Sequence, residues 1–205
     1  IVIDSGRCPW FGNAKYPSLS EPSPDYNGLT FAETFGDMAF TLYSHAVSLR
    51  DLGCTQSPMN AWITLNGVET LPLRMERHVE NAQKVAGFLQ QHPSVEWVSY
   101  AGLSSSPYHQ LAQKYLQGKA GSVFTFGIRG GYESGLRLLE KVELFSHVSN
   151  IGDSRSLILH PASTTHRQLS DEQRLTAGAG PEVIRLSVGI ESAEDLIADL
   201  ERALE

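Results

Sequence analysis

The sequence contains few cysteines, few lysines and no long apolar run, and each shortage excludes a class of protein. The two cysteines, Cys8 and Cys54, form neither a CxxC pair nor a disulfide framework, which favours a reducing, cytoplasmic setting. No apolar stretch approaches the roughly 18 residues of a membrane-spanning helix, so no membrane partner is expected. With five lysines and a net charge of -7, the chain also lacks the clustered basic residues that bind nucleic acid.

The remaining composition is typical of ordinary globular proteins. The 205 residues are 41% hydrophobic and 19% charged, and they can bury one large core or two small ones. Residues 1–3 are apolar and resemble a buried strand already under way, so we expect that further chain precedes them. Residues 4–30 are rich in Gly, Pro, Ser and Asn, which predicts a long irregular segment.

The apolar spacing divides the rest of the chain into a helical part and an alternating part. Helices are predicted over about 31–52, 58–67 and 69–91, and the last is long enough to connect two domains. Strands are then predicted at 95–100, 123–129, 144–149, 157–160 and 183–190. The helices of this part are predicted at about 108–115, 132–142, 171–177 and 193–204. The pattern indicates an α/β chain that ends in an α+β domain, with helices packed on one sheet.

Arg185 lies inside the otherwise apolar strand predicted at 183–190. By strand alternation, one face carries Ile184, Leu186, Val188 and Ile190. The other face carries Val183, Arg185, Ser187 and Gly189. The simpler interpretation is that the arginine face is exposed to water. The alternative is a partly enclosed guanidinium beside small neighbours, which would bind a carboxylate through two parallel hydrogen bonds. Periodicity alone favours the first interpretation.

A cluster of hydroxyl and imidazole side chains follows the strand predicted at 157–160. His160 and His166 do not have the spacing of a zinc motif and have no Cys or acidic ligand nearby in the sequence, so no metal is expected. The segment is predicted to be a strand end and a turn whose hydroxyls bond to the backbone. Ser156 and Thr165, on either side of the strand, could still line a polar pocket.

Six segments resemble the Cys/Met-metabolism family of pyridoxal-phosphate enzymes, and together they cover nearly the whole chain. The last two resemble the family in general. Residues 7–30 and 150–170 resemble its O-acetylhomoserine sulfhydrylase branch rather than the cystathionine synthases and lyases. The segments are IVIDSGRCPW, EPSPDYNGLTFAETFGDMAF, SPMNAWITLNGVETLPLRMERHVENAQKVAGFL, GLSSSPYHQLAQKYL, LFSHVSNIGDSRSLILHPASTTHRQLS and VIRLSVGIESAEDLIADLE.

The resemblance implies the second half of a fold-type-I pyridoxal-phosphate enzyme. Residues 1–75 would be the tail of the large cofactor-binding domain, 76–92 the connecting helix, and 93–205 the small C-terminal α+β domain. The implied reaction is γ-replacement of acetate by sulfide in O-acetyl-L-homoserine, giving homocysteine for methionine biosynthesis with pyridoxal 5'-phosphate as cofactor. The implied partners are an N-terminal half of the same protein and further copies in a homotetramer. The alternatives are a cystathionine γ-synthase or γ-lyase type of activity, and a non-catalytic subunit.

The resemblance also assigns roles to residues of this chain. Arg185 matches the family arginine that holds the substrate α-carboxylate, and Ser156, Thr165 and Asn150 match residues near the cofactor and substrate. Arg155 matches a position at which related enzymes differ, which suggests a role in side-chain selectivity. The family's Schiff-base lysine lies upstream of the matched part, and no lysine here has an equivalent context. No catalytic residue is therefore expected within this chain.

Overall fold

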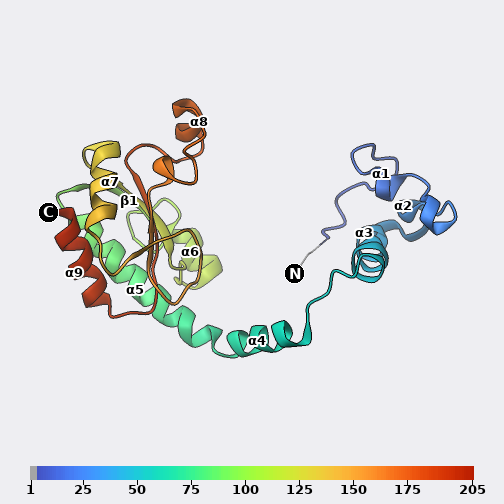
Figure 1. Ribbon diagram of the computed structural model, residues 1–205, viewed down its shortest axis with the longest axis horizontal. Coiled ribbons are helices and arrows are strands. Elements are labelled where there is room, and N and C mark those ends of the chain that lie inside the picture. The colour runs from blue at the N-terminus through green and yellow to red at the C-terminus, as the bar shows by residue number, and fades with distance from the viewer. Residues whose placement is uncertain (1–3) are drawn as a thin grey trace. The chain divides into compact units, whose positions relative to one another are not determined.

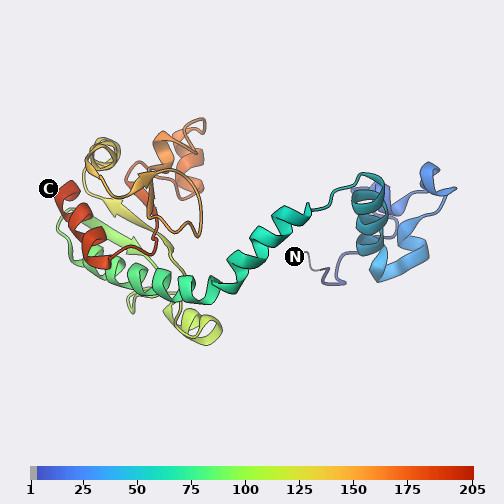
Figure 2. The same cartoon turned by 60° about the horizontal axis from the view of Figure 1, so that its bottom comes forward.

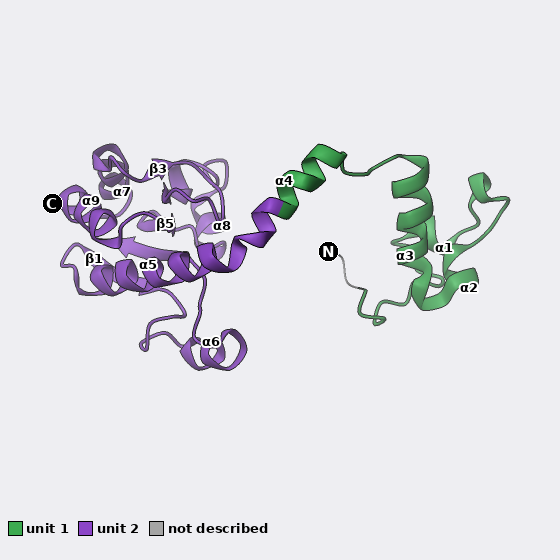
Figure 3. Cartoon of the chain, turned by 90° about the horizontal axis from the view of Figure 1, so that it is seen from below, with its two compact units in different colours: residues 1–65 green, residues 66–205 purple. Residues whose placement is uncertain are grey.

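The computed structural model describes residues 4–205, so the strand predicted at residues 1–3 lies outside the described residues. The chain separates into two compact units, one that ends at Leu65 and one that spans Asn66–Glu205 (Figure 3). Each unit has a hydrophobic cluster of its own. The assignment of residues 1–75 to a cofactor-binding domain stays a prediction.

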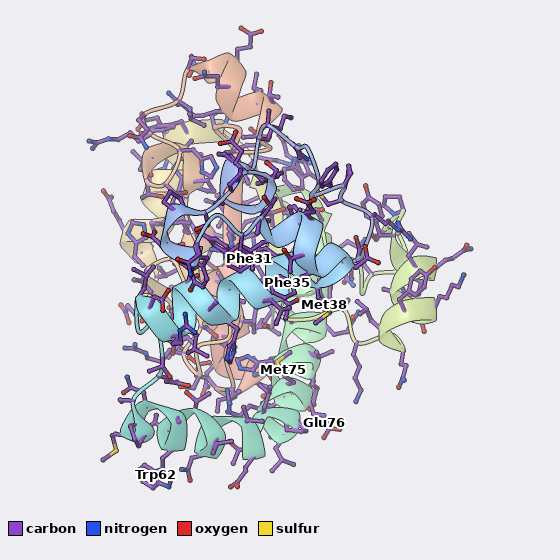
Figure 4. All side chains as sticks on the ribbon, turned by 90° about the vertical axis from the view of Figure 1, so that its right-hand side faces the viewer. Phe31, Phe35, Met38, Trp62, Met75 and Glu76 are labelled. Carbon is purple, nitrogen blue, oxygen red and sulfur yellow. The ribbon has the colours of Figure 1, made fainter. Side chains whose placement is uncertain are left out.

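Short helical segments make up the first unit. Its small core is formed by Leu19, Phe31, Ala32 and Ala39. The rings of Phe31 and Phe35 lie 5.9 Å apart, and both side chains are labelled in Figure 4. The elements are α1 (Pro17–Ser20), η1 (Pro24–Tyr26), α2 (Phe31–Phe35), η2 (Gly36–Met38), α3 (Ala39–Tyr43) and the π-helical η3 (Ser44–Asp51).

The continuous helix predicted over 31–52 is wrong. Gly36 ends α2 with a φ of 52°, a left-handed value that interrupts α-helical geometry and that glycine adopts at little cost. The chain then continues through η2, α3 and η3. Met38 and Leu49, two of the apolar residues whose spacing predicts that helix, are 52% and 41% exposed.

The second unit follows the predicted alternation of helices and strands (Figure 1). Helix α4 (Pro58–Glu69) begins in the first unit and ends in the second. The remaining helical elements are α5 (Leu71–Gln91), α6 (His109–Leu116), α7 (Gly131–Lys141), η4 (Pro161–Ser163), α8 (Asp171–Thr176) and α9 (Ala193–Leu204). The strands are β1 (Val95–Ser99), β2 (Val123–Ile128), β3 (Ser146–His147), β4 (Leu157–Leu159) and β5 (Val183–Ser187).

The five strands form one sheet in the order β1-β2-β5-β4-β3. Strand β5 lies in the middle and pairs antiparallel with both β2 and β4, whereas β3 and β4 are parallel. One face of the sheet, with Phe124, Phe126, Ile184 and Leu186, packs into a core with α5, α7 and α9. Figure 2 shows α5 and α9 side by side on this face. None of the helices within residues 4–205 is long and apolar enough to cross a membrane.

Two strands are shorter than the sequence predicts. The strand predicted at 144–149 is reduced to Ser146–His147, and that at 183–190 ends at Ser187. Beyond Ser187 the backbone hydrogen bonds go to segments outside the neighbouring strands. For example, the N–H of Ile190 donates to the carbonyl of Ser154 over 2.9 Å. The alternation therefore fails at Ile190, which was predicted to be buried but is 36% exposed.

Candidate functional site

Arg185 is in the central strand of the sheet, on the face opposite the three packed helices. It lies between Thr125 of β2 and Leu159 of β4, its partners in register. Arg185 is half-buried, while Val183 and Ser187 on the same face are 4% and 2% exposed. Burial therefore extends along this face on both sides of the arginine, and the face is not uniformly exposed to water.

The guanidinium of Arg185 is only loosely held. Its two terminal nitrogens donate to the Ser149 hydroxyl over 3.5 Å and to the Asn150 carbonyl over 3.4 Å, near the outer limit of hydrogen bonding. The arginine–carboxylate pairs found within residues 4–205 all involve other arginines. A half-buried guanidinium without a carboxylate partner in this part of the chain retains strong donors that can bind an anion in a bidentate manner.

Asn150 is a predicted site residue that contacts Arg185, and it does so through its backbone carbonyl. Its side-chain oxygen accepts the N–H of Ile151 over 2.9 Å and is not the atom that accepts from the guanidinium. Thr165 is exposed, and its hydroxyl lies 2.9 Å from Nδ1 of His166. No contact joins Thr165 to Arg185 in the described chain, so its substrate role stays a prediction.

Arg155 is exposed at the segment that precedes β4. Its side chain is 71% exposed and pairs with Asp153 at 3.5 Å. The backbone N–H of Arg155 also donates to the Asp153 carboxylate, and this bond lowers the pKa of Asp153. The guanidinium of Arg155 can therefore reach a ligand without breaking buried contacts, which suits the predicted selectivity role.

Ser156 is fully buried, and its hydrogen bonds are made within the protein. The Ser156 N–H donates to Glu191 Oε1 over 2.7 Å, and its hydroxyl donates to Oε2 over 2.9 Å. The same hydroxyl accepts the N–H of Gly189 over 2.7 Å. Ser156 therefore joins the segment before β4 to the segment after β5, and its direct contact with a substrate stays a prediction.

Sequence reasoning missed three polar residues that complete this region: Glu191, His78 and Asn81. The two residues of α5 are fully buried and contact the backbone just beyond Arg185. His78 Nδ1 lies 2.6 Å from the Val188 carbonyl, and Asn81 Nδ2 donates to the carbonyls of Gly189 and Glu191 over 3.0 and 2.8 Å. A signal was present in the sequence, since both polar residues fall on the buried stripe of a long helix.

The turn after β4 has the structure that the sequence predicts. The hydroxyls of Ser163 and Thr164 donate to the His160 carbonyl over 3.2 and 2.8 Å. His160 is buried against Tyr132, and burial lowers the pKa of its imidazole. Among the described residues no group of three His, Cys, Asp or Glu side chains could hold a metal ion.

The described residues fit the carboxylate end of an amino-acid substrate better than they fit an aldehyde cofactor. All five lysines, Lys15, Lys84, Lys114, Lys119 and Lys141, are exposed on the surface. Lys84 pairs with Glu80 at 2.9 Å and Lys119 with Glu76 at 3.5 Å. No lysine within residues 4–205 is buried, and no reaction step is assigned to a lysine here.

Comparison with known proteins identifies the family. Residues 27–205 match the Cys/Met metabolism PLP-dependent enzymes. The chain belongs to this family. It is 50% identical over 203 residues to O-acetyl-L-homoserine sulfhydrylase 1 of Thermus thermophilus, and 49% identical over 213 residues to the O-acetyl-L-homoserine sulfhydrylase of Leptospira meyeri. These alignments cover 99% and 100% of this chain.

A solved structure supports the same conclusion for the fold. A Campylobacter jejuni protein assigned as an O-acetylhomoserine (thiol)-lyase is 43% identical, with a TM-score of 0.82 over 95% of this chain. That crystal structure contains N'-pyridoxyl-lysine-5'-monophosphate. The predicted fold class, a pyridoxal-phosphate-dependent α/β enzyme fold, is thereby confirmed. The chain spans about half the length of these relatives, 48% of the first two and 46% of the third.

Proposed function

We propose that this chain is the C-terminal part of a pyridoxal-phosphate-dependent O-acetyl-L-homoserine sulfhydrylase. The proposed reaction replaces acetate by sulfide and yields homocysteine for methionine biosynthesis. The proposal includes a cytoplasmic homotetramer and an N-terminal half of the same protein that holds the cofactor. The names of the relatives support the substrate, since several are called O-acetyl-L-homoserine sulfhydrylase or homocysteine synthase at 44% to 50% identity.

The observation that carries the proposal is the guanidinium of Arg185, which has no carboxylate partner within the described residues. A central strand holds its backbone, and the Ser149 hydroxyl and Asn150 carbonyl direct its donors without neutralising its charge. The α-carboxylate of an amino acid matches these donors in charge and in planar geometry. Arg185 would thus bind and orient the substrate.

The other residues would act around this grip. Ser156 would hold the loop that carries Asn150 and Arg155 against the end of β5. Arg155 and Thr165, which are both exposed, would contact the side-chain end of the substrate. Pyridoxal phosphate, when bound to such an enzyme, supplies the electron sink for carbanion chemistry.

The function can be tested in a chimaera that places the N-terminal half of the Thermus thermophilus relative before this chain. The two proteins are 50% identical over the shared part, so this chain would replace a closely similar C-terminal half. The chimaera would be given O-acetyl-L-homoserine and sulfide, and homocysteine would be measured. We expect homocysteine as the main product at a rate that depends on sulfide.

The same preparation separates the alternatives. Cystathionine from added cysteine at a higher rate than homocysteine from sulfide would identify a cystathionine γ-synthase. Release of a 2-oxo acid in water, without incorporation of sulfide, would identify a γ-lyase. A folded chimaera that binds pyridoxal phosphate but converts no substrate would identify this chain as a non-catalytic subunit and contradict the proposal.

A further inference from the structure

His78 and Asn81 occupy buried positions of α5 where an apolar side chain would pack without any polar cost. Both are fully buried, next to the core residues Ala82 and Val85 of the same helix. His78 Nε2 and Asn81 Oδ1 find no hydrogen-bond partner within the described chain, and such buried polar atoms cost free energy. Their presence therefore needs an explanation other than packing.

The explanation lies in the backbone that they hold. The Val188 carbonyl can only accept, so His78 carries its proton on Nδ1 and donates over 2.6 Å. Asn81 donates to two carbonyls, those of Gly189 and Glu191. These bonds fix residues 188–191, which directly follow the strand of Arg185. We call His78 and Asn81 the α5 clamp.

Residues 188–191 also bind the segment before β4, which contains Asn150 and Ser156. Gly189 N–H binds the Ser156 hydroxyl, and the Glu191 carboxylate accepts two hydrogen bonds from Ser156. The segment before Ser156 continues back to Asn150, whose carbonyl accepts from Arg185. The position of the guanidinium relative to this loop is therefore set through residues 188–191.

Close packing makes this arrangement sensitive to small shifts. A Cβ atom on Gly189 would lie 2.4 Å from both the Ser154 carbonyl oxygen and Glu191 Oε2. The backbone at Gly189 thus packs directly against the backbone of residues 154 and 155, and no space is left for residues 188–191 to shift. Loss of a clamp bond would displace residues 188–191 and, through them, the loop relative to the guanidinium, and bidentate binding is sensitive to such movement.

We propose that His78 and Asn81 are positioning residues for the carboxylate grip of Arg185. The inference rests on the proposed function, because it assumes that Arg185 binds the substrate α-carboxylate. Neither residue touches the substrate. A weakened clamp lowers the affinity for the amino-acid substrate and leaves the affinity for sulfide unchanged. A purely structural role would instead reduce the amount of active enzyme, which lowers kcat without raising KM.

Two substitutions of His78 separate these roles. His78→Leu fills the space but removes the donor, whereas His78→Asn keeps a donor at the position of Nδ1 and leaves a small cavity. In the chimaera we expect His78→Leu to raise KM for O-acetyl-L-homoserine about fivefold or more, as for a lost hydrogen bond. We expect His78→Asn to stay within about twofold of the parent, even if it is less stable. Gln83→Leu, an exposed position of the same helix, is the control.

Amide hydrogen exchange of this chain gives a readout that does not need activity. His78→Leu should exchange the amides of Gly189 and Ile190 about tenfold faster, and His78→Asn should not. Unchanged KM and unchanged exchange in His78→Leu, in an active chimaera, would overturn the inference. If the parent chimaera is inactive, the proposed function has failed, and equal exchange in the two His78 variants would still overturn the positioning role.

Discussion

Ser156 and Glu191 form a closed pair of hydrogen bonds in which one carboxylate holds both the N–H and the hydroxyl of one serine. The distances are 2.7 Å to Oε1 and 2.9 Å to Oε2. The pair joins the segment before β4 to the segment after β5, which are far apart in the sequence. The loop that contacts Arg185 and the strand that carries it therefore behave as one structural element.

Glu191→Gln should weaken this joint. The amide keeps one acceptor for the Ser156 N–H but replaces the acceptor of the Ser156 hydroxyl with a donor, and it removes the negative charge. The free energy of unfolding should fall by about 1–3 kcal/mol, the range for a charge-assisted hydrogen bond. Urea denaturation followed by circular dichroism would measure it. Glu140→Gln, at an exposed position of α7, should change stability by less than about 0.5 kcal/mol.

Gly189→Ala should be among the most destabilising single-methyl additions in the chain. The new Cβ would lie 2.4 Å from the Ser154 carbonyl oxygen and 2.6 Å from the Arg155 carbonyl carbon, so the backbone must shift. We expect a loss of about 2 kcal/mol or more. Gly87→Ala is the matched control, because no atom lies within 4 Å of its new Cβ inside α5. That substitution should stabilise the helix by up to about 1 kcal/mol, and equal effects at the two glycines would refute the packing argument.

The hydrogen bonds of Asp199 should make the stability of the second unit fall at acid pH. Burial raises the pKa of this carboxyl, but hydrogen bonds from the N–H groups of Glu143, Leu144 and Phe145 and from Arg202 outweigh burial, and the pKa is lowered. A folded-state pKa below the unfolded value stabilises the fold above the unfolded pKa, about 4. This stability is lost as the pH falls through the folded-state pKa.

The measurement is the urea midpoint as a function of pH for the parent and Asp199→Asn. The variant should be less stable by about 2 kcal/mol or more at pH 7, because the amide no longer accepts charge-assisted bonds at both positions. The difference should shrink as the pH falls below about 4, the unfolded-state pKa, and through the lowered folded-state pKa, at which the parent carboxylate becomes protonated. Asp195→Asn, on the exposed side of α9, should show little of either effect. A constant difference down to pH 2 would contradict the assignment.

Arg155 should influence which acyl-homoserine is preferred. Its side chain is 71% exposed and pairs with Asp153 at 3.5 Å. A cation at the side-chain end of the substrate favours a succinyl group, which carries a second carboxylate, over an acetyl group. In the active chimaera, Arg155→Gln should lower kcat/KM for O-succinyl-L-homoserine severalfold more than for O-acetyl-L-homoserine. Equal losses for the two substrates would remove Arg155 from the selectivity account.

The secondary structure of the second unit could be predicted from sequence because it depends on local patterns. Helix α9 was predicted at its observed bounds, and the hydroxyl of Ser192 caps it by accepting the N–H of Asp195. The helix predicted over 31–52 failed because apolar spacing does not register a left-handed glycine such as Gly36. The end of β5 at Ser187 could not be predicted either, since it is set by segments distant in the sequence.

The candidate site was only partly predictable for the same reason. Arg185 could be found because a charge inside an apolar strand is visible locally. The clamp residue His78 is 110 residues from its partner Val188, and no periodicity connects the two positions. Apolar spacing on this helix predicts a stripe that starts at Leu71 and ends at Leu89. Leu89 is fully buried but Leu71 is 41% exposed, whereas His78, which the apolar pattern omits, is fully buried. His78 and Asn81 were missed because a search for apolar spacing does not count polar residues, even where they lie on the buried side of a helix.

The central claim is that Arg185 holds the substrate α-carboxylate, and Arg185→Lys tests it most directly. Lysine keeps the charge but loses the planar pair of donors. In the active chimaera, kcat/KM for O-acetyl-L-homoserine should fall about 10- to 100-fold, equivalent to roughly 1.5–3 kcal/mol, mainly through a higher KM. Arg137→Lys, at an exposed position of α7, is the matched control and should leave KM unchanged. If Arg185→Lys also leaves KM unchanged, Arg185 does not bind the substrate, and the proposed site is wrong.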